Sequence, residues 1–243
     1  MFVNVTKATK RFDNGNVAYK NVSFSAQEGE IIGLVGTSGC GKSTLLRSIS
    51  GLDPEYEGSV RINNYEAKEC KESIGFMFQE PRLMPWLSVL DNVQFGSNHK
   101  QSQHAELLVE QVGLKGFEKH YPKELSGGMA QRAAIARALM TSPKLLLLDE
   151  PFSALDAFTK MQLQDLLLSV WEKNRATMLL VTHDIDEALY LCDRILVFRG
   201  QPGELSREIR VDRGENLRSR GDEKQLKQKA QILALLNIER SIS

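Results

Sequence analysis

Runs of apolar residues recur along the chain. Four of them, at 31–35, 145–148, 178–181 and 195–198, are apolar almost throughout. Short continuous runs of this kind are typical of strands that a parallel sheet buries on both faces. A fifth strand candidate, SIGFMFQ, ends at Gln79.

Segments with helical spacing separate these runs. The pattern predicts helices from about Lys42 to Ser50, with Gly51 as the residue after the helix, and from Ala157 to Trp171. A short helix is expected at 184–192. Because strands alternate with helices, the fold class expected is α/β with a mostly parallel sheet.

Three parts of the chain depart from this alternation. The front, to about Ser25, has short β-like runs around a turn at 13–16, which predicts an antiparallel hairpin. The segment from about 80 to 140 is mostly helical, and we interpret it as a helical subdomain. The tail 200–243 is charged and loop-like, then helical from Glu223 to Leu236. We expect one domain over 1–243.

Composition narrows the choice of partners. Of 243 residues, 42% are hydrophobic and 26% charged, and 31 Lys and Arg balance 31 Asp and Glu, so bulk charge does not favour nucleic acid or a membrane surface. The three cysteines, Cys40, Cys70 and Cys192, form no CxxC pair, which fits a reducing cytosol without disulfides or a zinc site. The sequence contains neither a signal peptide nor a membrane-spanning run, so we expect any work at a membrane to go through a partner.

The strongest chemical motif is GTSGCGKS, which matches the phosphate-binding loop GxxxxGK[ST] and lies between an apolar strand and a helix. Its glycines allow the backbone N–H groups to face a phosphate, and the helix dipole adds positive potential. Lys42 would reach the β- and γ-phosphates, and Ser43 would ligate Mg²⁺. The motif consists of Gly36, Thr37, Ser38, Gly39, Cys40, Gly41, Lys42 and Ser43.

Polar side chains also follow the predicted strands. Asp149 and Glu150 end the run LLLL, where Asp149 suits a Mg²⁺ shell and Glu150 would orient or deprotonate a water. His183 follows another strand, at an edge where it could contact a γ-phosphate. Taken without the other motifs, Gln79 is an unremarkable amide, and Phe12 is either an adenine platform or a core aromatic.

A second helix start of the anion-binding kind begins at Ser126. The stretch SGGMAQRAAIARALM places Ser126 at an N-cap position before two glycines. Its presence 84 residues after Lys42 has no explanation from local chemistry alone.

Six motifs in one order, GTSGCGKS, FQEP, LSGGMAQR, LLLLDEP, SALD and VTHD, resemble the nucleotide-binding subunit of ABC transporters over about residues 1–200. The resemblance implies that Phe12 stacks on adenine, that Gln79 touches Mg²⁺ and the attacking water, that Glu150 is the catalytic base and that His183 contacts the γ-phosphate. It also implies a head-to-tail dimer. In such a dimer the phosphate-binding loop of one cassette (the P-loop, at Lys42) and the signature motif of the other (LSGGMAQR, with Ser126, Gly127 and Gly128) enclose ATP. The nucleotide contacts so implied are Phe12, Gly36 to Thr44, Ser126, Gly127, Gly128 and the interface residue Asp156.

Within the family, the chain is most similar to importers of nitrate, sulfonates, taurine and related small solutes, and some importers of pyrimidine precursors share its motifs. QEPRLMPW, from Gln79 to Trp86, LSGGMAQR and the tail motif RSRGD near Arg218 to Asp222 carry this similarity. One departure is Met129, where many members have Gln; we expect it to be tolerated, because the serine and the backbone amides make the phosphate contacts. The resemblance also implies that the tail is too short for a regulatory domain and that the solute is chosen elsewhere.

The partners expected are a second cassette, membrane permease subunits docking near Gln79 to Gln94, and indirectly an extracytoplasmic binding protein, with no nucleic acid. The subunit would lie on the cytoplasmic face of the membrane. The apolar cluster from Leu83 to Leu87 is either the docking surface or a loop that covers the core. Two other classes remain: a soluble cassette ATPase acting on DNA or ribosomes, and an ATP-binding module without turnover. A single P-loop and no sustained heptads disfavour the first, and the Asp149–Glu150 pair with His183 disfavours the second.

Overall fold

The computed structural model describes residues 1–97, 102–212 and 220–237, and the chain forms two compact units. The first unit consists of Met1–Lys71 and Thr177–Ser243, and the second of Glu72–Ala176. The predicted helical subdomain at 80–140 falls within the second unit. Of the tail motif RSRGD, Arg218 and Ser219 lie outside the described residues.

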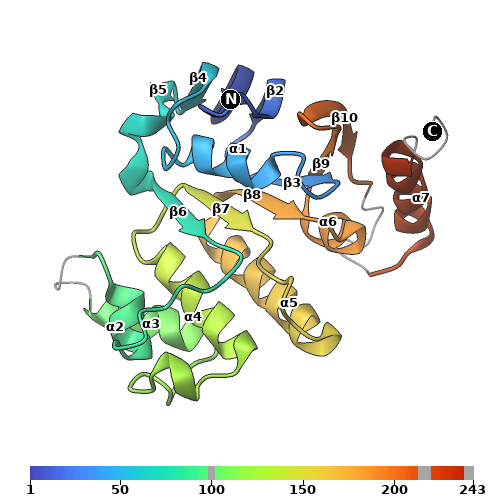
Figure 1. The fold of residues 1–243 in the computed structure, drawn as a ribbon. Coiled ribbons are helices and arrows are strands. Elements are labelled where there is room, and N and C mark those ends of the chain that lie inside the picture. The colour runs from blue at the N-terminus through green and yellow to red at the C-terminus, as the bar shows by residue number, and fades with distance from the viewer. Residues whose placement is uncertain (98–101, 213–219, 238–243) are drawn as a thin grey trace. The chain divides into compact units, whose positions relative to one another are not determined.

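The first unit contains most of the strands (Figure 1). Its elements are β1 (Val3–Arg11), β2 (Val17–Ala26), β3 (Ile31–Gly36), α1 (Lys42–Ile49), β4 (Glu57–Ile62), β5 (Tyr65–Glu66), the 3-10 turn η1 (Ala67–Glu69), β8 (Thr177–Thr182), α6 (Ile185–Leu191), β9 (Arg194–Arg199), β10 (Glu204–Arg210) and α7 (Glu223–Asn237).

These strands form two sheets. The order β2-β1-β4-β5 is antiparallel, as the predicted N-terminal hairpin requires. In the other, β3 lies between β8 and β9 and is parallel to both. Every residue of β3 and of β8 is buried, which explains why both read as continuous apolar runs.

Helix α1 packs on these strands, and a buried hydrogen bond ties it to the antiparallel sheet. The Tyr19 hydroxyl of β2 donates to Ser48 Oγ of α1 at 2.8 Å. Burial raises the pKa of Tyr19 to about 12, so this hydroxyl remains a donor at neutral pH. The predicted end of the helix is confirmed: Ser50 is the C-cap, and Gly51 follows with a φ of +72°.

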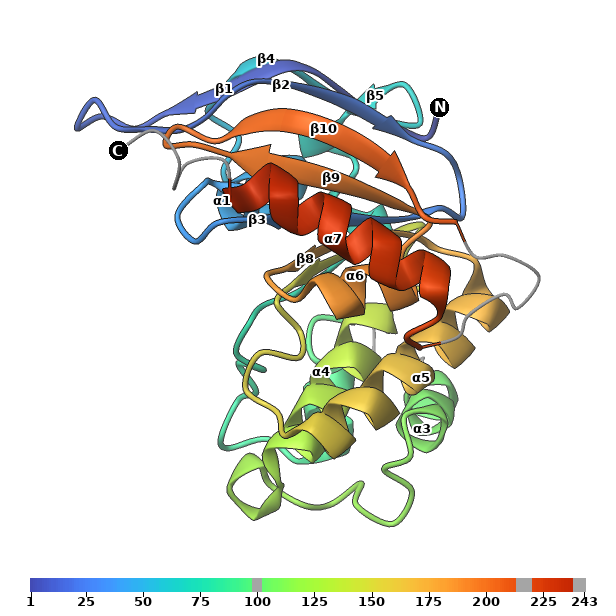
Figure 2. The ribbon, with the colours of Figure 1, turned by 90° about the vertical axis from the view of Figure 1, so that its right-hand side faces the viewer.

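The tail differs from the sequence-based expectation. We expected it to be loop-like from Gly200 to about residue 222, which is wrong for Glu204–Arg210, because this segment is strand β10, antiparallel to β9. An edge strand pairs on one side only and tolerates charged residues, and a register shift between Leu205 and Arg207 breaks its alternation. The predicted tail helix is confirmed as α7, which lies along α6 and β9 (Figure 2).

The second unit is mainly helical, with two parallel strands. Its elements are β6 (Ile74–Met77), α2 (Val89–Gln94), α3 (Ser102–Gln111), the 3-10 turn η4 (Pro122–Glu124), α4 (Gly127–Leu139), β7 (Leu145–Asp149) and α5 (Ala157–Asn174), and η2 (Lys71–Ser73) begins at the last residue of the first unit.

Helix α4 is central to the second unit, since it packs against α2, α3, α5 and β6. It begins directly after Ser126, as the sequence predicts, and half of its buried residues are alanines, which allow neighbouring elements to approach closely. Across the described parts of both units, we find no helix with the length and apolarity that a membrane crossing needs.

Candidate functional site

The loop between β3 and α1 has a backbone that only glycine fits at several positions. Gly39 and Gly41 both have a φ of +80°, a conformation that other residues rarely adopt. A Cβ added at Gly36 would lie 2.5 Å from the carbonyl oxygen of Phe198 in β9, and one at Gly41 would collide with the carbonyl oxygen of Ala18. The glycines of the predicted phosphate-binding loop therefore meet a steric requirement of this turn.

Lys42 lies at the start of α1 with its ammonium group held by this loop. Its Nζ donates to the carbonyl oxygens of Gly36 and Thr37, each at 2.9 Å, and lies 3.5 Å from Cys40 Sγ. The N-cap residue Gly41 supplies no side-chain cap to the first-turn N–H groups of α1. A buried cation beside such N–H groups suits a phosphate.

His183 lies at the same edge of the first unit's sheet as this loop. Val35 of β3 pairs with Thr182 of β8, so Gly36 and His183 follow paired residues at the carboxyl ends of neighbouring parallel strands. His183 is exposed. The structure thus brings the loop and this imidazole to one edge, as the sequence predicts for a ligand site.

Phe12 is at the hairpin between β1 and β2, and it is 40% exposed, so it is not a core aromatic. Lys10 Nζ lies 5.4 Å from the centroid of its ring, and the same ammonium pairs with Asp53 at 2.5 Å. An exposed aromatic ring that has a buried cation near it can stack on a flat ligand.

In the second unit, Gln79 and Glu150 are brought together. Met77 of β6 pairs with Leu148 of β7, and Gln79 and Glu150 each follow two residues after this pair. Gln79 Nε2 lies 3.5 Å from Glu150 Oε2 and 3.3 Å from Ser153 Oγ. Asp149, at the end of β7, is only 4% exposed.

Glu150 has a φ of +47°, in the left-handed region that a residue with a side chain rarely adopts. The N–H and the hydroxyl of Ser153 both donate to the carbonyl oxygen of Glu150, at 3.2 and 3.1 Å, and hold this turn. Strained backbone of this kind persists where the surroundings determine it, and it is concentrated at functional sites. In this conformation the Glu150 carboxylate lies 3.5 Å from Gln79 Nε2.

The signature stretch begins α4. Ser126 is exposed, and its Oγ accepts a hydrogen bond from the N–H of Met129 at 3.3 Å, which confirms its predicted place as N-cap. This contact uses only the backbone of Met129. A Cβ at Gly128 would lie 2.5 Å from Thr159 Cγ2 of α5, so a larger residue at position 128 would force the Thr159 side chain to move.

Asp156 caps α5 beside this contact. Its Oδ1 accepts from the N–H groups of Phe158 and Thr159, at 3.1 and 3.0 Å. Hydrogen bonds from the side chain and backbone of Thr159 lower the pKa of Asp156, so the carboxylate is charged at neutral pH. Asp156 and the signature glycine Gly128 therefore both adjoin Thr159.

Sequence reasoning missed two side chains of α4, Gln131 and Arg137. Both donate to backbone carbonyl groups in the segment that begins at Gln79. A polar residue among buried alanines was the available signal for Gln131, which is 2% exposed. Burial lowers the pKa of Arg137 below its ordinary value.

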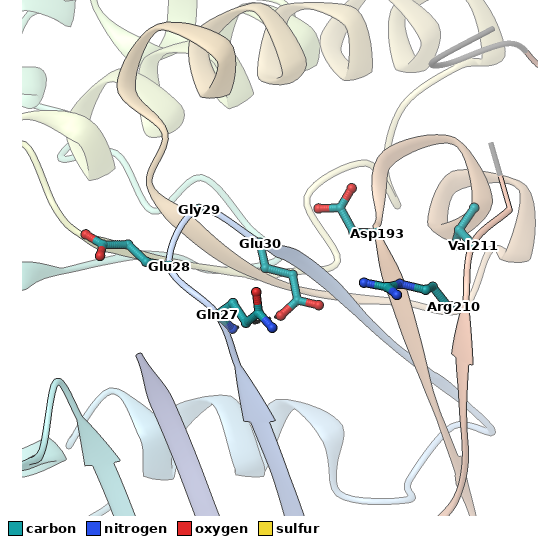
Figure 3. Close-up of a pocket in the computed structure, with 7 residues that line it drawn as sticks. All are labelled: Gln27, Glu28, Gly29, Glu30, Asp193, Arg210 and Val211. Carbon is teal, nitrogen blue, oxygen red and sulfur yellow. Dashed lines mark hydrogen bonds between the residues drawn. The ribbon is translucent and has the colours of Figure 1, made fainter. Parts of the chain in front are cut away.

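A separate pocket of about 390 Å³ lies at the amino end of β3, the end away from the glycine-rich loop (Figure 3). Its side chains come from the β2–β3 connection and from the ends of β9 and β10. Asp193 is already used inside the fold, because it accepts a hydrogen bond from the N–H of Ile31 at 2.8 Å. The pocket contains none of the predicted site residues; it is lined by Gln27, Glu28, Gly29, Glu30, Asp193, Arg210 and Val211.

Comparison with known proteins identifies the family. Residues 19–153 match the family model described as ABC transporter. The chain is 52% identical over 198 residues to aliphatic sulfonates import ATP-binding protein SsuB 2 of Pseudomonas syringae pv. tomato, covering 81% of this chain and 82% of that protein. It is 52% identical over 193 residues to SsuB of Bacillus subtilis, covering 78% and 76%.

Solved structures agree with this assignment. The ATP-binding cassette MJ0796, described as a dimeric post-hydrolysis state bound to ADP and Pi, superposes with a TM-score of 0.76 at 34% identity and covers 86% of this chain and 99% of its own. The structure of cbiO1 from Clostridium perfringens, part of the cbiONQ transporter complex, has a TM-score of 0.80 over 98% of this chain and 94% of its own; at 24% identity it supports the fold alone.

These matches confirm the expected P-loop α/β fold and the expected activity, ATP hydrolysis coupled to transport. The glycine-rich loop with its held lysine and the exposed Ser126 N-cap are local features of such a cassette. The chain belongs to the ABC transporter family, as the ATP-binding subunit of an import system.

Proposed function

We propose that this subunit powers uptake of an aliphatic sulfonate or a related small anionic solute through a separate permease. The observation that carries the proposal is the 52% identity, over about four fifths of each chain, to a sulfonate import ATP-binding protein. The motif QEPRLMPW, which carried the resemblance to this group of importers, points the same way. Neither a role on DNA or ribosomes nor binding without turnover has comparable support.

The test of the solute class is transport itself. We expect the complex purified with this chain to contain a permease and a solute-binding protein, and that binding protein to bind alkanesulfonates more tightly than nitrate or a pyrimidine precursor. Cells that lack the gene for this chain should not grow on an alkanesulfonate as sole sulfur source, whereas their growth on sulfate should continue. A binding protein that prefers nitrate would contradict the sulfonate assignment and leave the import function intact.

We propose that Lys42 and the loop N–H groups bind the β- and γ-phosphates of ATP, with Phe12 stacking on adenine and His183 contacting the γ-phosphate. The exposure of Phe12 and His183, the place of His183 at the same sheet edge as the loop, and the hold of the loop on Lys42 support these roles. Glu150 serves as the base that orients and deprotonates the attacking water, and Gln79 holds that carboxylate through its side-chain amide.

The oxygen donors Ser43, Asp149 and Gln79 fit Mg²⁺, a hard cation that prefers oxygen ligands. Because Gln79 Nε2 faces Glu150 and Ser153, the amide oxygen of Gln79 is the atom left for the metal. Bound Mg²⁺ would neutralise charge on the transferred phosphoryl group. Phosphoryl transfer depends mainly on such positioning and electrostatics.

We further propose that two cassettes pair head to tail, so that Ser126, Gly127 and Gly128 of one chain complete the site at Lys42 of the other, with Asp156 at the interface. Support comes from the exposure of Ser126 and from the relative MJ0796, which is described as dimeric. Such pairing explains why one chain has two helix N-termini suited to binding phosphate, one at Lys42 and one at Ser126.

The permease is proposed to dock on the segment Gln79 to Gln94, at the cytoplasmic face of the membrane. Trp86 is 69% exposed, so it does not cover the core. The loop that presents it is organised by Asn92, a fully buried residue whose amide accepts from the N–H of Met84 at 2.7 Å and donates to Met84 O and Leu87 O at 3.1 and 3.0 Å. An exposed indole on a rigid loop is the kind of anchor that dominates interfaces.

Replacing Trp86 with Ala should uncouple uptake from hydrolysis. Because truncation of a central Trp costs an interface about 2 kcal/mol or more, uptake by the complex should fall while its basal ATPase rate is kept. Uptake of labelled solute and phosphate release would be measured on the same preparation. The control is Tyr65→Ala, which removes an aromatic of similar exposure, 62%, from β5. Undiminished uptake by the Trp86 variant would exclude Trp86 as an anchor.

A further inference from the structure

Helix α4 holds the backbone that follows Gln79 through three hydrogen bonds. Gln131 Nε2 donates to the carbonyl oxygen of Gln79 at 3.1 Å. Arg137 donates to the carbonyl oxygen of Pro81 at 2.5 Å through NH2, and to that of Arg82 at 2.8 Å through NH1. Three carbonyl groups within four residues are thus fixed by side chains from one helix.

The bond from Gln131 is not explained by stability alone. Gln131 is buried, and its Oε1 has no hydrogen-bond partner among the described residues. A buried amide with one end unpaired is a poorer filler of this space than an apolar side chain of the same length. The contact that the residue does make is with the main chain of Gln79, which points to a role in placing that residue.

The same helix begins at the signature serine. Ser126 is the N-cap of α4, and Gln131 lies on the second turn of this helix, so the cap and Gln131 belong to one rigid element. The Gln79 residue that Gln131 contacts through its backbone is in turn hydrogen-bonded, through its side chain, to Glu150. A displacement of the α4 N-terminus therefore has a direct path to the residue that faces the catalytic carboxylate.

We propose that Gln131 is a positioning residue that transmits the engagement of Ser126 to Gln79 and so to Glu150. This inference rests on the proposed function, in which Ser126 serves the partner cassette's ATP and Glu150 the chain's own. When α4 of one chain closes on the nucleotide bound to the partner, it then also adjusts the hydrolytic site of its own chain. The two ATP sites of a dimer become cooperative through this hydrogen bond.

The test is Gln131→Met, which keeps the length of the side chain and removes the donor. The unfolding temperature should be unchanged or higher, because the unpaired Oε1 is removed with the donor. We expect kcat for ATP hydrolysis to fall about tenfold, with KM within about twofold, since small misplacements of catalytic groups cost up to about 100-fold. The Hill coefficient for ATP should fall toward one.

The matched control is Arg132→Met on the same helix. Arg132 also donates to a backbone carbonyl, that of Val112 at 3.0 Å, which is away from Gln79. It should leave kcat and the Hill coefficient unchanged. Equal losses in both variants would mean that α4 is merely destabilised, which overturns the proposal.

A double-mutant cycle with Gln79→Ala decides whether Gln131 acts through Gln79. Once the Gln79 side chain is absent, Gln131→Met should lower kcat no further. A full additional tenfold loss would overturn the proposal. If the methionine variant does not fold, Gln131→Asn, whose amide is one methylene shorter and falls short of the Gln79 carbonyl, takes its place in the same cycle. Failure of the wild-type chain to hydrolyse ATP would instead count against the proposed function.

Discussion

Replacing Glu150 with Gln is expected to stop ATP turnover while ATP still binds. The substitution keeps the shape of the side chain but removes the carboxylate that we assign as the base, and general bases contribute about 100- to 10,000-fold to such rates. ATP binding should persist because Lys42 and the loop at Gly36–Gly41 are unaltered in the other compact unit. Phosphate release and equilibrium binding of a labelled nucleotide measure the two effects separately.

The control for the loss of charge is Glu80→Gln, which neutralises an exposed carboxylate next to Gln79. It should retain turnover, since Glu80 has no assigned role in the chemistry. If the Glu150 variant hydrolyses ATP at the wild-type rate, the base lies elsewhere. If instead it loses ATP binding, Glu150 acts in nucleotide affinity rather than in the chemical step.

Replacing Ser126 with Arg should abolish turnover and leave nucleotide binding by the same chain largely intact. Ser126 is exposed at the N-terminus of α4, so a long cationic side chain can extend outward without disturbing the fold. It would then obstruct the approach of the partner's nucleotide to the signature helix. Ser126→Ala is the matched control: loss of the cap costs about 1 kcal/mol, but nothing bulky is introduced.

Complementation tests the pairing directly. Ser126→Arg and Lys42→Ala chains should each be inactive alone. In a mixed dimer, the intact Lys42 loop of the first meets the intact Ser126 of the second and forms one complete site, so coexpression in equal amounts should restore up to roughly a quarter of wild-type turnover for a symmetric dimer. No recovery on mixing would mean that Ser126 acts within its own chain.

Local chemistry accounts for much of what could be predicted. The positive φ of Gly39 and Gly41 belongs to the turn itself, and the cap at Ser126 uses the N–H of Met129 three residues later, so the motifs were readable before the structure. The buried strands β3 and β8 were readable for the same reason, because burial on both faces leaves an uninterrupted apolar run.

Partners distant in sequence could not be read in this way. Strand β10 has five polar or charged residues in seven, and it is a strand only because β9 offers an unpaired edge. The hydrogen bond from Gln131 to Gln79 spans 52 residues, and those of Arg137 to Pro81 and Arg82 span 56 and 55. Neither side of such a contact carries a local pattern that reveals the other.

The sequence by itself determined the family, the ATP chemistry and the order of the motifs, because each motif places its functional groups within a single turn or strand end. Tertiary structure alone decided how the signature helix is joined to the residues after Gln79, and that Trp86 is displayed by a loop folded around Asn92. In these arrangements, side chains donate hydrogen bonds to backbone carbonyl groups. Because every residue has such a carbonyl group, the sequence does not indicate which of them accepts the bond.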